Sequence, residues 1–426
     1  MKSLIIAIAI FFTALLPSAS CYTASIRAER LFNGPVICAG DVPGYSAIFN
    51  GDVHTTEDGA LMGLFRMARE GYSKVSANND RGYTLEDYFS DIGLFTSRDL
   101  GKSWEFQRIF VAGNDNLKSH IEHIKNSRQQ LLTERVLESL ESISQGSMTF
   151  NTLEDPRFID VLDGCGKQRH YIFATEVPSD GKPYHMCALE VTFETDQHIE
   201  IINCSTFGPP ENKDNWFLNI IPSSTQLKQI DHIKTMGISI SDSGYPIVVA
   251  TRICGEIQII PFGAVDDIFS VTDHQWERIL NEPKCFTTIL KPDRVIYRSL
   301  GSNDQPISIT PEIVLRAVLS HPEYSDMRWD LWKWFFYHTT KNSDRLEYET
   351  WAGIIDESAN PIFLLPYSIQ KPEEAFEIEG DIGYVVFNSG NIVIDGKIRH
   401  FNGVADTDVA VSETDEVALL EELLTN

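Results

Sequence analysis

The sequence predicts an all-β protein, and two observations support that prediction. Short runs rich in β-branched and aromatic residues recur along the chain, separated by turns that contain Gly, Asn and Asp. Such runs occupy residues 46–51, 171–175, 246–251 and 383–388. The chain also has 426 residues, a length that favours a propeller over a sandwich or a barrel, although no repeat recurs at a fixed period.

Two segments depart from this pattern and predict helical insertions between strands. Residues 115–145 place aliphatic side chains at helical spacing among charges, which predicts one or two amphipathic helices. Residues 308–322 contain an apolar run after Pro311, and proline is favoured at the first position of a helix. Because apolar stripes usually face a core, we expect packing helices in both places. A short acidic, leucine-rich helix is expected over residues 414–424.

The charge of the chain limits the partners that it can bind. Its formal net charge is −26 and its pI is near 4.7. Nucleic acids and anionic lipid surfaces require a basic footprint, so we expect neither as a partner. A neutral ligand such as an oligosaccharide is compatible with this charge, while the oligomeric state is left open.

Residues 1–20 are typical of a secretory signal peptide. Lys2 precedes an apolar run, and small residues follow Pro17. The run is shorter than the roughly 20 apolar residues that span a bilayer, so no membrane-spanning segment is expected after signal removal. We therefore predict a secreted or periplasmic protein, and cleavage before Cys21 would allow a lipoprotein anchor. The remaining cysteines are dispersed, fit no zinc-finger spacing and leave disulfide pairing open.

The stretch Glu154-Asp155-Pro156-Arg157 sets two carboxylates and a guanidinium around a proline. A carboxylic acid can protonate a leaving oxygen, and arginine offers a fork of donors to an anion. Because proline disfavours the helical region for the residue before it, we expect an extended conformation at Asp155. Taken alone, the tetrapeptide is equally compatible with a turn that carries a surface salt bridge.

Further motifs occur in a fixed order around this tetrapeptide. They are Phe49-Asn50-Gly51 with Leu64-Phe65-Arg66, residues 92–99 with Trp104, Lys213-Asp214-Asn215-Trp216, residues 334–338, residues 352–356 and Gly403-Val404-Ala405-Asp406-Thr407. Together they resemble glycoside hydrolase family 130, the β-mannoside phosphorylases and β-mannosidases. The resemblance spans residues 30–424. It implies one catalytic domain, a five-bladed β-propeller with helical insertions and a central site.

The resemblance also implies roles for single residues. It makes Asp155 the general acid, with Glu154 and Arg157 orienting it or contacting the ligand. It implies that substrate is bound by these two and by Asn50, Asn215 and Asp406. In the family's phosphorylases the acid reaches the glycosidic oxygen through a sugar hydroxyl, phosphate attacks the opposite face and configuration is inverted. Phosphate contacts would then come from Arg66, Arg69, Lys213, Arg252 and His338.

The chain departs from the family pattern beside the implied phosphate site. Gly51-Asp52 stands where the family usually has proline and glycine, Thr339-Thr340 replaces a glycine after the Tyr-His pair, and Ile253 replaces a proline. These changes and the predicted export favour an inverting hydrolase. Such an enzyme uses water and two carboxyl groups about 6.5–9.5 Å apart. Asp406, Glu377 and Asp52 are candidates for the base.

Two alternatives to the hydrolase stay open. One is a glycoside phosphorylase that uses inorganic phosphate as co-substrate, and the other is an exported sugar-binding propeller without catalysis. In every case the expected ligand is an oligosaccharide or glycan, and neither a metal nor another cofactor is expected.

Two other patterns are interpreted as structural. Residues 97–104 match the Asp-box pattern of sialidase propellers, in which an aspartate and a serine hold a hairpin turn above a tryptophan. Trp329, Trp332 and Trp334 lie close together in sequence and are expected to pack in the core rather than against a sugar.

Overall fold

The computed structural model describes most of the chain between residues 26 and 425. The described residues are 26–70, 89–126, 130–146, 150–162, 167–177, 185–195, 198–207, 236–239, 247–253, 256–261, 287–290, 296–324, 327, 329–341, 346–356 and 360–425. The predicted signal peptide, Cys21, Lys213 and Asn215 lie outside the described residues.

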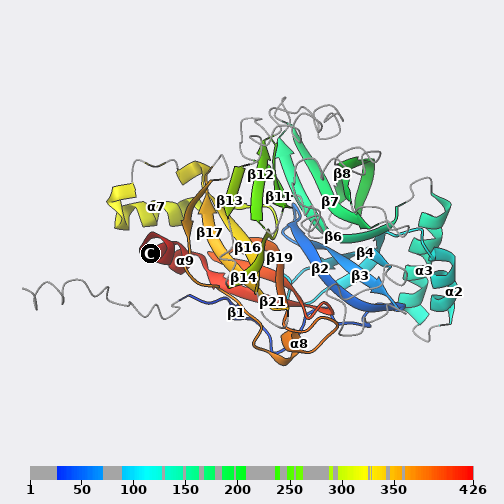
Figure 1. Cartoon of the computed structure of the whole chain (residues 1–426). Helices are drawn as coiled ribbons and strands as arrows, with labels where there is room; N and C mark the ends of the chain where they lie inside the picture. Colours follow the sequence, from blue (N-terminus) through cyan, green and yellow to red (C-terminus); the bar gives the residue numbers. More distant parts are fainter. Residues whose placement is uncertain are drawn as a thin grey trace, which may run out of the picture.

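The described strands form five antiparallel sheets that follow one another along the chain (Figure 1). The first sheet contains, in spatial order, β2 (Tyr45–Thr55), β3 (Leu61–Arg69), β4 (Ser90–Ser97) and β5 (Glu105–Val111). The second contains β6 (Thr152–Leu162), β7 (Gln168–Val177), β8 (His185–Thr195) and β9 (His198–Phe207). Both sheets are simple antiparallel meanders, in which each strand pairs with the next along the chain.

The third sheet contains β10 (Met236–Ser239), β11 (Ile247–Ile253), β12 (Glu256–Pro261) and β13 (Thr287–Leu290). The fourth contains β14 (Tyr297–Ser302), β16 (Lys333–Lys341), β17 (Tyr348–Ile355) and β18 (Pro361–Leu364), and β15 (Ile307–Ser308) pairs with β16. The fifth contains β19 (Val386–Ile394), β20 (Lys397–Val404) and β21 (Asp408–Asp415). The N-terminal strand β1 (Glu29–Arg30) completes this last sheet by pairing with β21.

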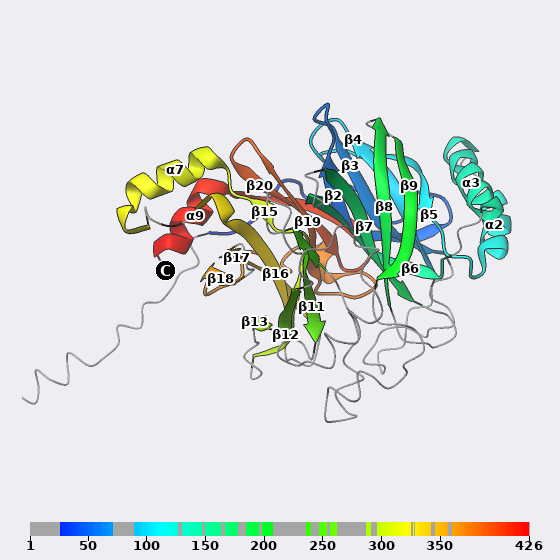
Figure 2. The same ribbon diagram turned by 90° about the horizontal axis from the view of Figure 1, so that it is seen from above.

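Successive sheets contact one another in a ring. Strand β2 contacts β6, β6 contacts β10, β11 contacts β14, β17 contacts β19, and β19 returns to β2. Seen from above, β6 to β9 and β15 to β18 lie on opposite sides of the molecule (Figure 2). The arrangement is propeller-like, and the all-β prediction is confirmed.

Helices lie at two ends of the molecule (Figure 1). At one end are α2 (Leu117–Lys125) and α3 (Gln130–Gln145), and at the other are α7 (Pro311–Ser320) and α9 (Glu416–Thr425). Shorter elements are α8 (Ala375–Ile378), η4 (Pro322–Tyr324) and η5 (Trp329–Leu331). Helices are thus found in the three regions where the sequence predicts them. Within the described ranges, no helix is both long enough and apolar enough to span a bilayer.

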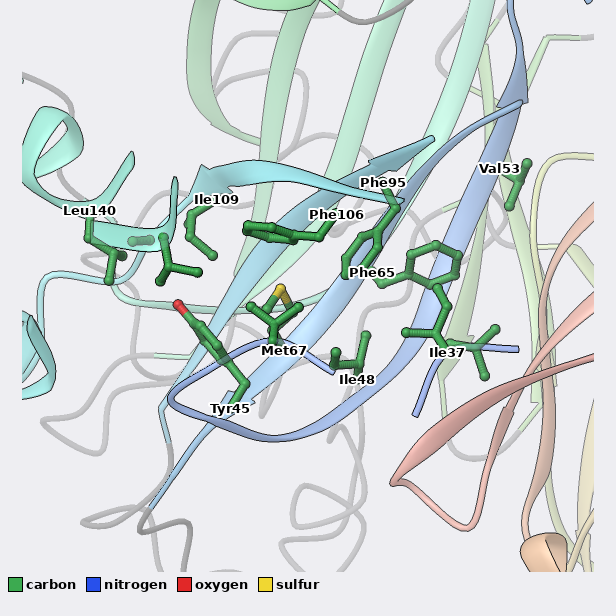
Figure 3. Close-up of a cluster of buried hydrophobic side chains, with 14 of the residues drawn as sticks. Ile37, Tyr45, Ile48, Val53, Phe65, Met67, Phe95, Phe106, Ile109 and Leu140 are labelled. Carbon is green, nitrogen blue, oxygen red and sulfur yellow. The ribbon is translucent and has the colours of Figure 1, made fainter. Parts of the chain in front are cut away.

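The helical insertions contribute to the hydrophobic core. Leu117, Ile121 and Ile124 of α2 and Val136 and Leu140 of α3 are buried in one cluster with side chains of the first sheet. Figure 3 shows Leu140 at one end of this cluster and Tyr45, Met67, Phe106 and Phe65 following it. At the opposite end of the molecule, Trp329, Trp332 and Trp334 are buried with apolar residues of α7 and α9. Both results agree with the packing roles expected from the sequence.

Candidate functional site

Strands β2 and β6 bulge at corresponding points where they meet. The β2–β3 register shifts between Phe49 and Asp52, and the β6–β7 register shifts between Glu154 and Arg157. The extra residues include Asn50 with a φ of 46° and Asp155 with a φ of 50°. Asn and Asp adopt this left-handed region more readily than most residues. The expectation of an extended Asp155 is therefore wrong, because the bulge turns its backbone.

The bulges direct the side chains of Asn50 and Asp155 toward each other. Asp155 Oδ1 accepts hydrogen bonds from Asn50 Nδ2 and from Arg66 Nη1, both at 3.2 Å. Arg66 Nη2 donates to Glu154 Oε1 at 3.1 Å, so one guanidinium bridges both carboxylates. The side chains of Arg66, Glu154 and Asp155 are 5%, 8% and 2% exposed. The tetrapeptide is therefore part of a buried charge cluster and not of a surface salt bridge.

The last residue of the tetrapeptide reaches the fourth and fifth sheets. Arg157 Nε donates to the main-chain oxygen of Asn303 at 2.7 Å, and its guanidinium carbon lies 5.7 Å from the centre of the Phe387 ring. Its Nη1 donates to the oxygen of Pro156 at 2.8 Å. Its Nη2 is buried and has no hydrogen-bond partner among the described residues. Arg157 thus retains one donor for a ligand.

His338 of β16 meets the same two residues as Arg157. Its Nδ1 lies 2.8 Å from Asn303 Oδ1, and its ring centre lies 4.7 Å from that of Phe387. Only 1% of His338 is exposed. The structure therefore brings together two residues that the family resemblance implies, Arg157 and His338, through Asn303 and Phe387.

Two buried carboxyl groups, those of Asp52 and Asp304, lie near Arg157. Asp52 accepts hydrogen bonds from the main-chain N–H groups of Val53 at 2.7 Å and Phe158 at 2.8 Å. Burial raises the pKa of Asp52 to about 7, although the Arg157 charge opposes that shift. Burial, and then the charge of Asp52, raise the pKa of Asp304 well above its usual value. The two groups therefore disfavour each other's ionisation.

Arg69, an implied phosphate contact, is engaged by structural contacts. Its Nε and Nη2 bind the two carboxylate oxygens of Asp91 at 2.9 Å and 2.6 Å. Its Nη1 and Nη2 also donate to the main-chain oxygens of Asp115 and Gly113, each at 2.6 Å. Since all these groups are buried or partly buried, Arg69 serves to anchor the chain that leads into α2.

The candidates for the general base differ in their surroundings. Glu377 is fully buried in α8, and its carboxylate binds Arg30 Nε at 2.6 Å and Arg30 Nη2 at 2.7 Å. It also accepts the N–H groups of Glu373 and Glu374, so it acts as a helix cap. Asp406 lies in the β20–β21 turn with a φ of 50° and is partly exposed. The carboxylate of Glu377 is therefore engaged in structural contacts, and Asp406 and Asp52 remain the candidates to propose as the base.

Three residues of the implied site cannot be placed. Lys213 and Asn215 lie outside the described residues, and of Arg252 only the backbone, in β11, is described.

The sequence reading did not identify Asn303, Asp304, Asn388 and Asn391, which form a buried polar chain. Asn303 Nδ2 donates to Asn388 Oδ1 at 3.1 Å, Asn388 Nδ2 to Asn391 Oδ1 at 3.0 Å, and Asn391 Nδ2 to Asp304 Oδ2 at 2.8 Å. A weak signal was present, since polar residues at 303–305 directly follow β14. In the described part of the chain, no group of His, Cys, Asp and Glu side chains is arranged to hold a metal ion.

Comparison with known proteins supports the resemblance seen in the sequence. Residues 333–424 match a glycoside hydrolase family 130 model described as beta-1,4-mannooligosaccharide phosphorylase. The matched segment covers β16 to α9 and includes His338 and Asp406. A search of curated proteins finds no match.

Solved structures resemble the chain over most of its length. One is a β-1,2-mannobiose phosphorylase from Listeria innocua in complex with β-1,2-mannobiose, with a TM-score of 0.58 and 17% identity over 94% of this chain and 99% of that one. Another is a glycosyl hydrolase from Bacteroides ovatus, with a TM-score of 0.54 and 14% identity over 91% of this chain and 94% of that one. A third is described with the statement that the GH130 family of mannoside phosphorylases contains glycoside hydrolases that target β-1,2 mannosidic linkages in Candida mannan. It has a TM-score of 0.53 and 13% identity over 92% of this chain and 94% of that one. At such identities the likeness shows the fold.

Proposed function

We propose that this chain, a divergent relative of glycoside hydrolase family 130, cleaves β-mannosidic bonds in oligosaccharides with Asp155 as the general acid. The observation that carries the proposal is the buried carboxyl of Asp155, held at one oxygen by Asn50 and Arg66. A carboxyl group fixed in this way can be aligned with a leaving oxygen before the reaction begins.

The reaction has a simple division of roles. Asp155 gives its proton to the glycosidic oxygen, either directly or through a sugar hydroxyl. The nucleophile attacks the anomeric carbon from the opposite face, and the configuration is inverted. Arg66 holds Asp155 and Glu154 in place, and Asn50 and Asp406 are proposed to contact the sugar.

We favour water over phosphate as the nucleophile. Phosphate needs cationic donors that are not already neutralised. Arg66 bridges Glu154 and Asp155, and Arg69 binds Asp91 through two nitrogens. Of the implied phosphate contacts, these two are therefore engaged by carboxylates. An inverting hydrolase also needs a base, for which Asp52 and Asp406 are the candidates.

A phosphorylase remains the second candidate because of two observations. The family model that matches residues 333–424 is described as a phosphorylase. Arg157 Nη2 is a buried donor without a partner among the described residues, and it could meet a phosphate oxygen near His338.

The proposal extends to architecture and location. We infer that the five sheets are the blades of a closed five-bladed propeller, since the sheets contact one another in a ring. Export remains part of the proposal on the evidence of the first 20 residues of the sequence.

The test compares wild type, Asp155→Asn and Asp395→Asn on β-1,2- and β-1,4-mannooligosaccharides, with and without phosphate. Asp395 lies in the exposed β19–β20 turn and serves as the control. Reducing sugar formed without phosphate supports the hydrolase, and mannose 1-phosphate formed only with phosphate supports the phosphorylase. We expect Asp155→Asn to lower kcat by about 10²–10⁴-fold. Normal turnover by this variant contradicts the role of Asp155, and binding without turnover in wild type supports a sugar-binding protein.

A further inference from the structure

Arg157, Asn303, His338 and Phe387 form a closed ring of contacts from three sheets and the β14–β15 connection. Arg157 Nε donates to the main-chain oxygen of Asn303, and the side-chain oxygen of Asn303 faces His338 Nδ1. Phe387 completes the ring, because the Arg157 guanidinium and the His338 imidazole both pack against it. Asn303 is 2% exposed, so water does not compete for these contacts.

The orientation of the Asn303 amide follows from its other neighbours. Its Nδ2 donates to Asn388, and the chain of donors continues through Asn391 to a carboxyl oxygen of Asp304. Asn388 Oδ1 accepts from Asn303 Nδ2 and also from Asn391 Nδ2, the latter at 2.8 Å, so the amide nitrogen of Asn303 faces Asn388. Asn303 must then present its oxygen to His338, and His338 Nδ1 must carry a hydrogen.

We propose that Asn303 is a positioning residue that fixes the Nδ1–H tautomer of His338 and holds Arg157 beside it. The inference rests on the proposed function, because it states which tautomer of the His338 imidazole would contact the substrate. With hydrogen on Nδ1, Nε2 of the neutral ring is an acceptor, suited to a sugar hydroxyl or a water molecule. Only the imidazolium could donate from Nε2 to a phosphate oxygen.

The contacts of His338 fit this assignment. Asn303, which faces Nδ1, is uncharged, and Phe387 packs against both the His338 ring and the Arg157 guanidinium. The ring also approaches Tyr348 of β17, with ring centres 5.5 Å apart. With hydrogen held on Nδ1, the acceptor at Nε2 of the neutral ring suits a hydroxyl or a water molecule better than phosphate.

The tautomer can be tested directly by NMR of the full chain labelled with ¹⁵N-histidine, with His338→Gln used to assign the signal. Wild type should show a protonated Nδ1 and an unprotonated Nε2. Asn303→Ala should remove this preference, and Asn303→Asp should raise the pKa of His338 by about one unit or more, since a carboxylate stabilises imidazolium. His400 provides an internal reference, because its Nδ1 faces Asn391 Oδ1 at 2.6 Å and not Asn303.

The control variant is Asn402→Ala, since Asn402 is buried in β20 but bonds His400 and Ser412. An Nε2–H tautomer in wild type, or an unchanged His338 signal in Asn303→Ala, overturns the proposal. If one variant does not fold, as judged by the His400 signal, the other and the wild-type tautomer still decide the question.

Kinetics then separate this proposal from the proposed function. Asn303→Ala should lower kcat by roughly tenfold or more, because His338 loses the side-chain partner of its Nδ1, while the main-chain oxygen that Arg157 binds is retained. In Asn303→Asp the fraction of product formed by phosphorolysis at pH 6–7 should increase. If no β-mannoside is cleaved by wild type, the proposed function fails, while the NMR result still tests the role of Asn303.

Discussion

Arg66 connects the proposed acid to its neighbour and lies almost entirely out of solvent. Its two terminal nitrogens bind Asp155 and Glu154, and its guanidinium lies 4.7 Å from the Phe49 ring centre. Two carboxylates this close repel each other unless a cation lies between them, and no bulk water screens them here. Glu154 and Asp155 therefore depend on a residue that lies 88 and 89 positions away from them in sequence.

We expect Arg66→Ala to destabilise the protein by about 3–5 kcal/mol, because it removes the guanidinium that bonds two buried acidic side chains. Arg66→Lys should cost less, since it keeps the charge but loses the two-point geometry. Urea unfolding measures both. The matched control is Arg98→Ala, where the side chain is 65% exposed and lies 3.6 Å from Asp58, and where we expect less than about 1 kcal/mol. Equal losses for Arg66→Ala and Arg98→Ala would contradict the argument.

The buried carboxyl pair predicts how stability depends on pH. Folding raises the pKa of Asp52 from 3.8 to about 7 and that of Asp304 well above 3.8. The folded state therefore holds protons that the unfolded chain loses above about pH 4. The stability that Asp52 contributes is fully present below about pH 4 and is lost as pH rises toward 7, and Asp304 adds a loss in the same direction. For Asp52 alone the loss is roughly 4 kcal/mol.

We predict that Asp304→Asn stabilises the protein at pH 8 relative to wild type by about 1–3 kcal/mol, because the buried acid no longer has to ionise or stay protonated at that pH. At pH 4.5 the gain should be clearly smaller, since the unfolded chain loses this proton only above about pH 4. Denaturant unfolding at the two pH values measures the difference, with Asp395→Asn in an exposed turn as the control. A pH dependence that is the same in wild type and Asp304→Asn would exclude the pair as its cause.

At the scale of elements, the β4–β5 hairpin shows how a turn motif joins two sheets. Asp99 Oδ1 accepts from Ser97 Oγ at 2.8 Å and from the N–H of Ser103 at 2.9 Å, and Asp99 Oδ2 accepts from Ser103 Oγ at 2.6 Å. The Trp104 ring packs 5.7 Å from Phe401 of β20, centre to centre. The motif thus has the structural role that the sequence predicts, and it holds the first sheet against the fifth.

We expect Asp99→Ala to destabilise the protein by about 1–2 kcal/mol through the loss of these turn hydrogen bonds, while kcat stays at the wild-type value. Asp99→Asn should retain part of the stability, because the amide oxygen still accepts. Thermal unfolding measures the change in stability, and steady-state kinetics measure kcat. A loss of kcat in folded Asp99→Ala would place this hairpin in the site.

The sequence predicts the elements better than the contacts between them. Strands follow from β-branched runs and turns, and α2, α3 and α7 follow from apolar spacing, because these signals are local. The left-handed Asp155 was not predictable from its proline, since the bulge is set by pairing with β7. Asn303 and Asp304 were missed for a similar reason. Their role arises from Asn388 and Asn391, which are 85 and 87 residues away.

At the scale of the whole molecule, β1 joins the two ends of the chain. Arg30 pairs with Ser412 of β21, its guanidinium binds Glu377, and its Nη2 donates to the oxygen of Lys371 at 2.8 Å. The fifth sheet therefore combines the first described strand with the last three. In a ring of sheets, each of which contacts its neighbours, loosening this closure should weaken all of them together.

The ion pair between Arg30 and Glu377 holds this closure and can be tested by mutation. Arg30→Ala leaves the carboxylate of Glu377, which is 0% exposed, without its cation, and should cost about 3 kcal/mol. Since the sheets contact one another in a ring, we expect them to unfold as a unit, so the urea midpoint should fall while the slope stays constant and the transition stays single. Arg30→Lys should recover part of the loss, and Lys397→Ala, in an ion pair whose lysine is 51% exposed, should change little. A separate early transition in Arg30→Ala, with the remaining sheets still folded, would mean that closure by β1 stabilises the fifth sheet alone.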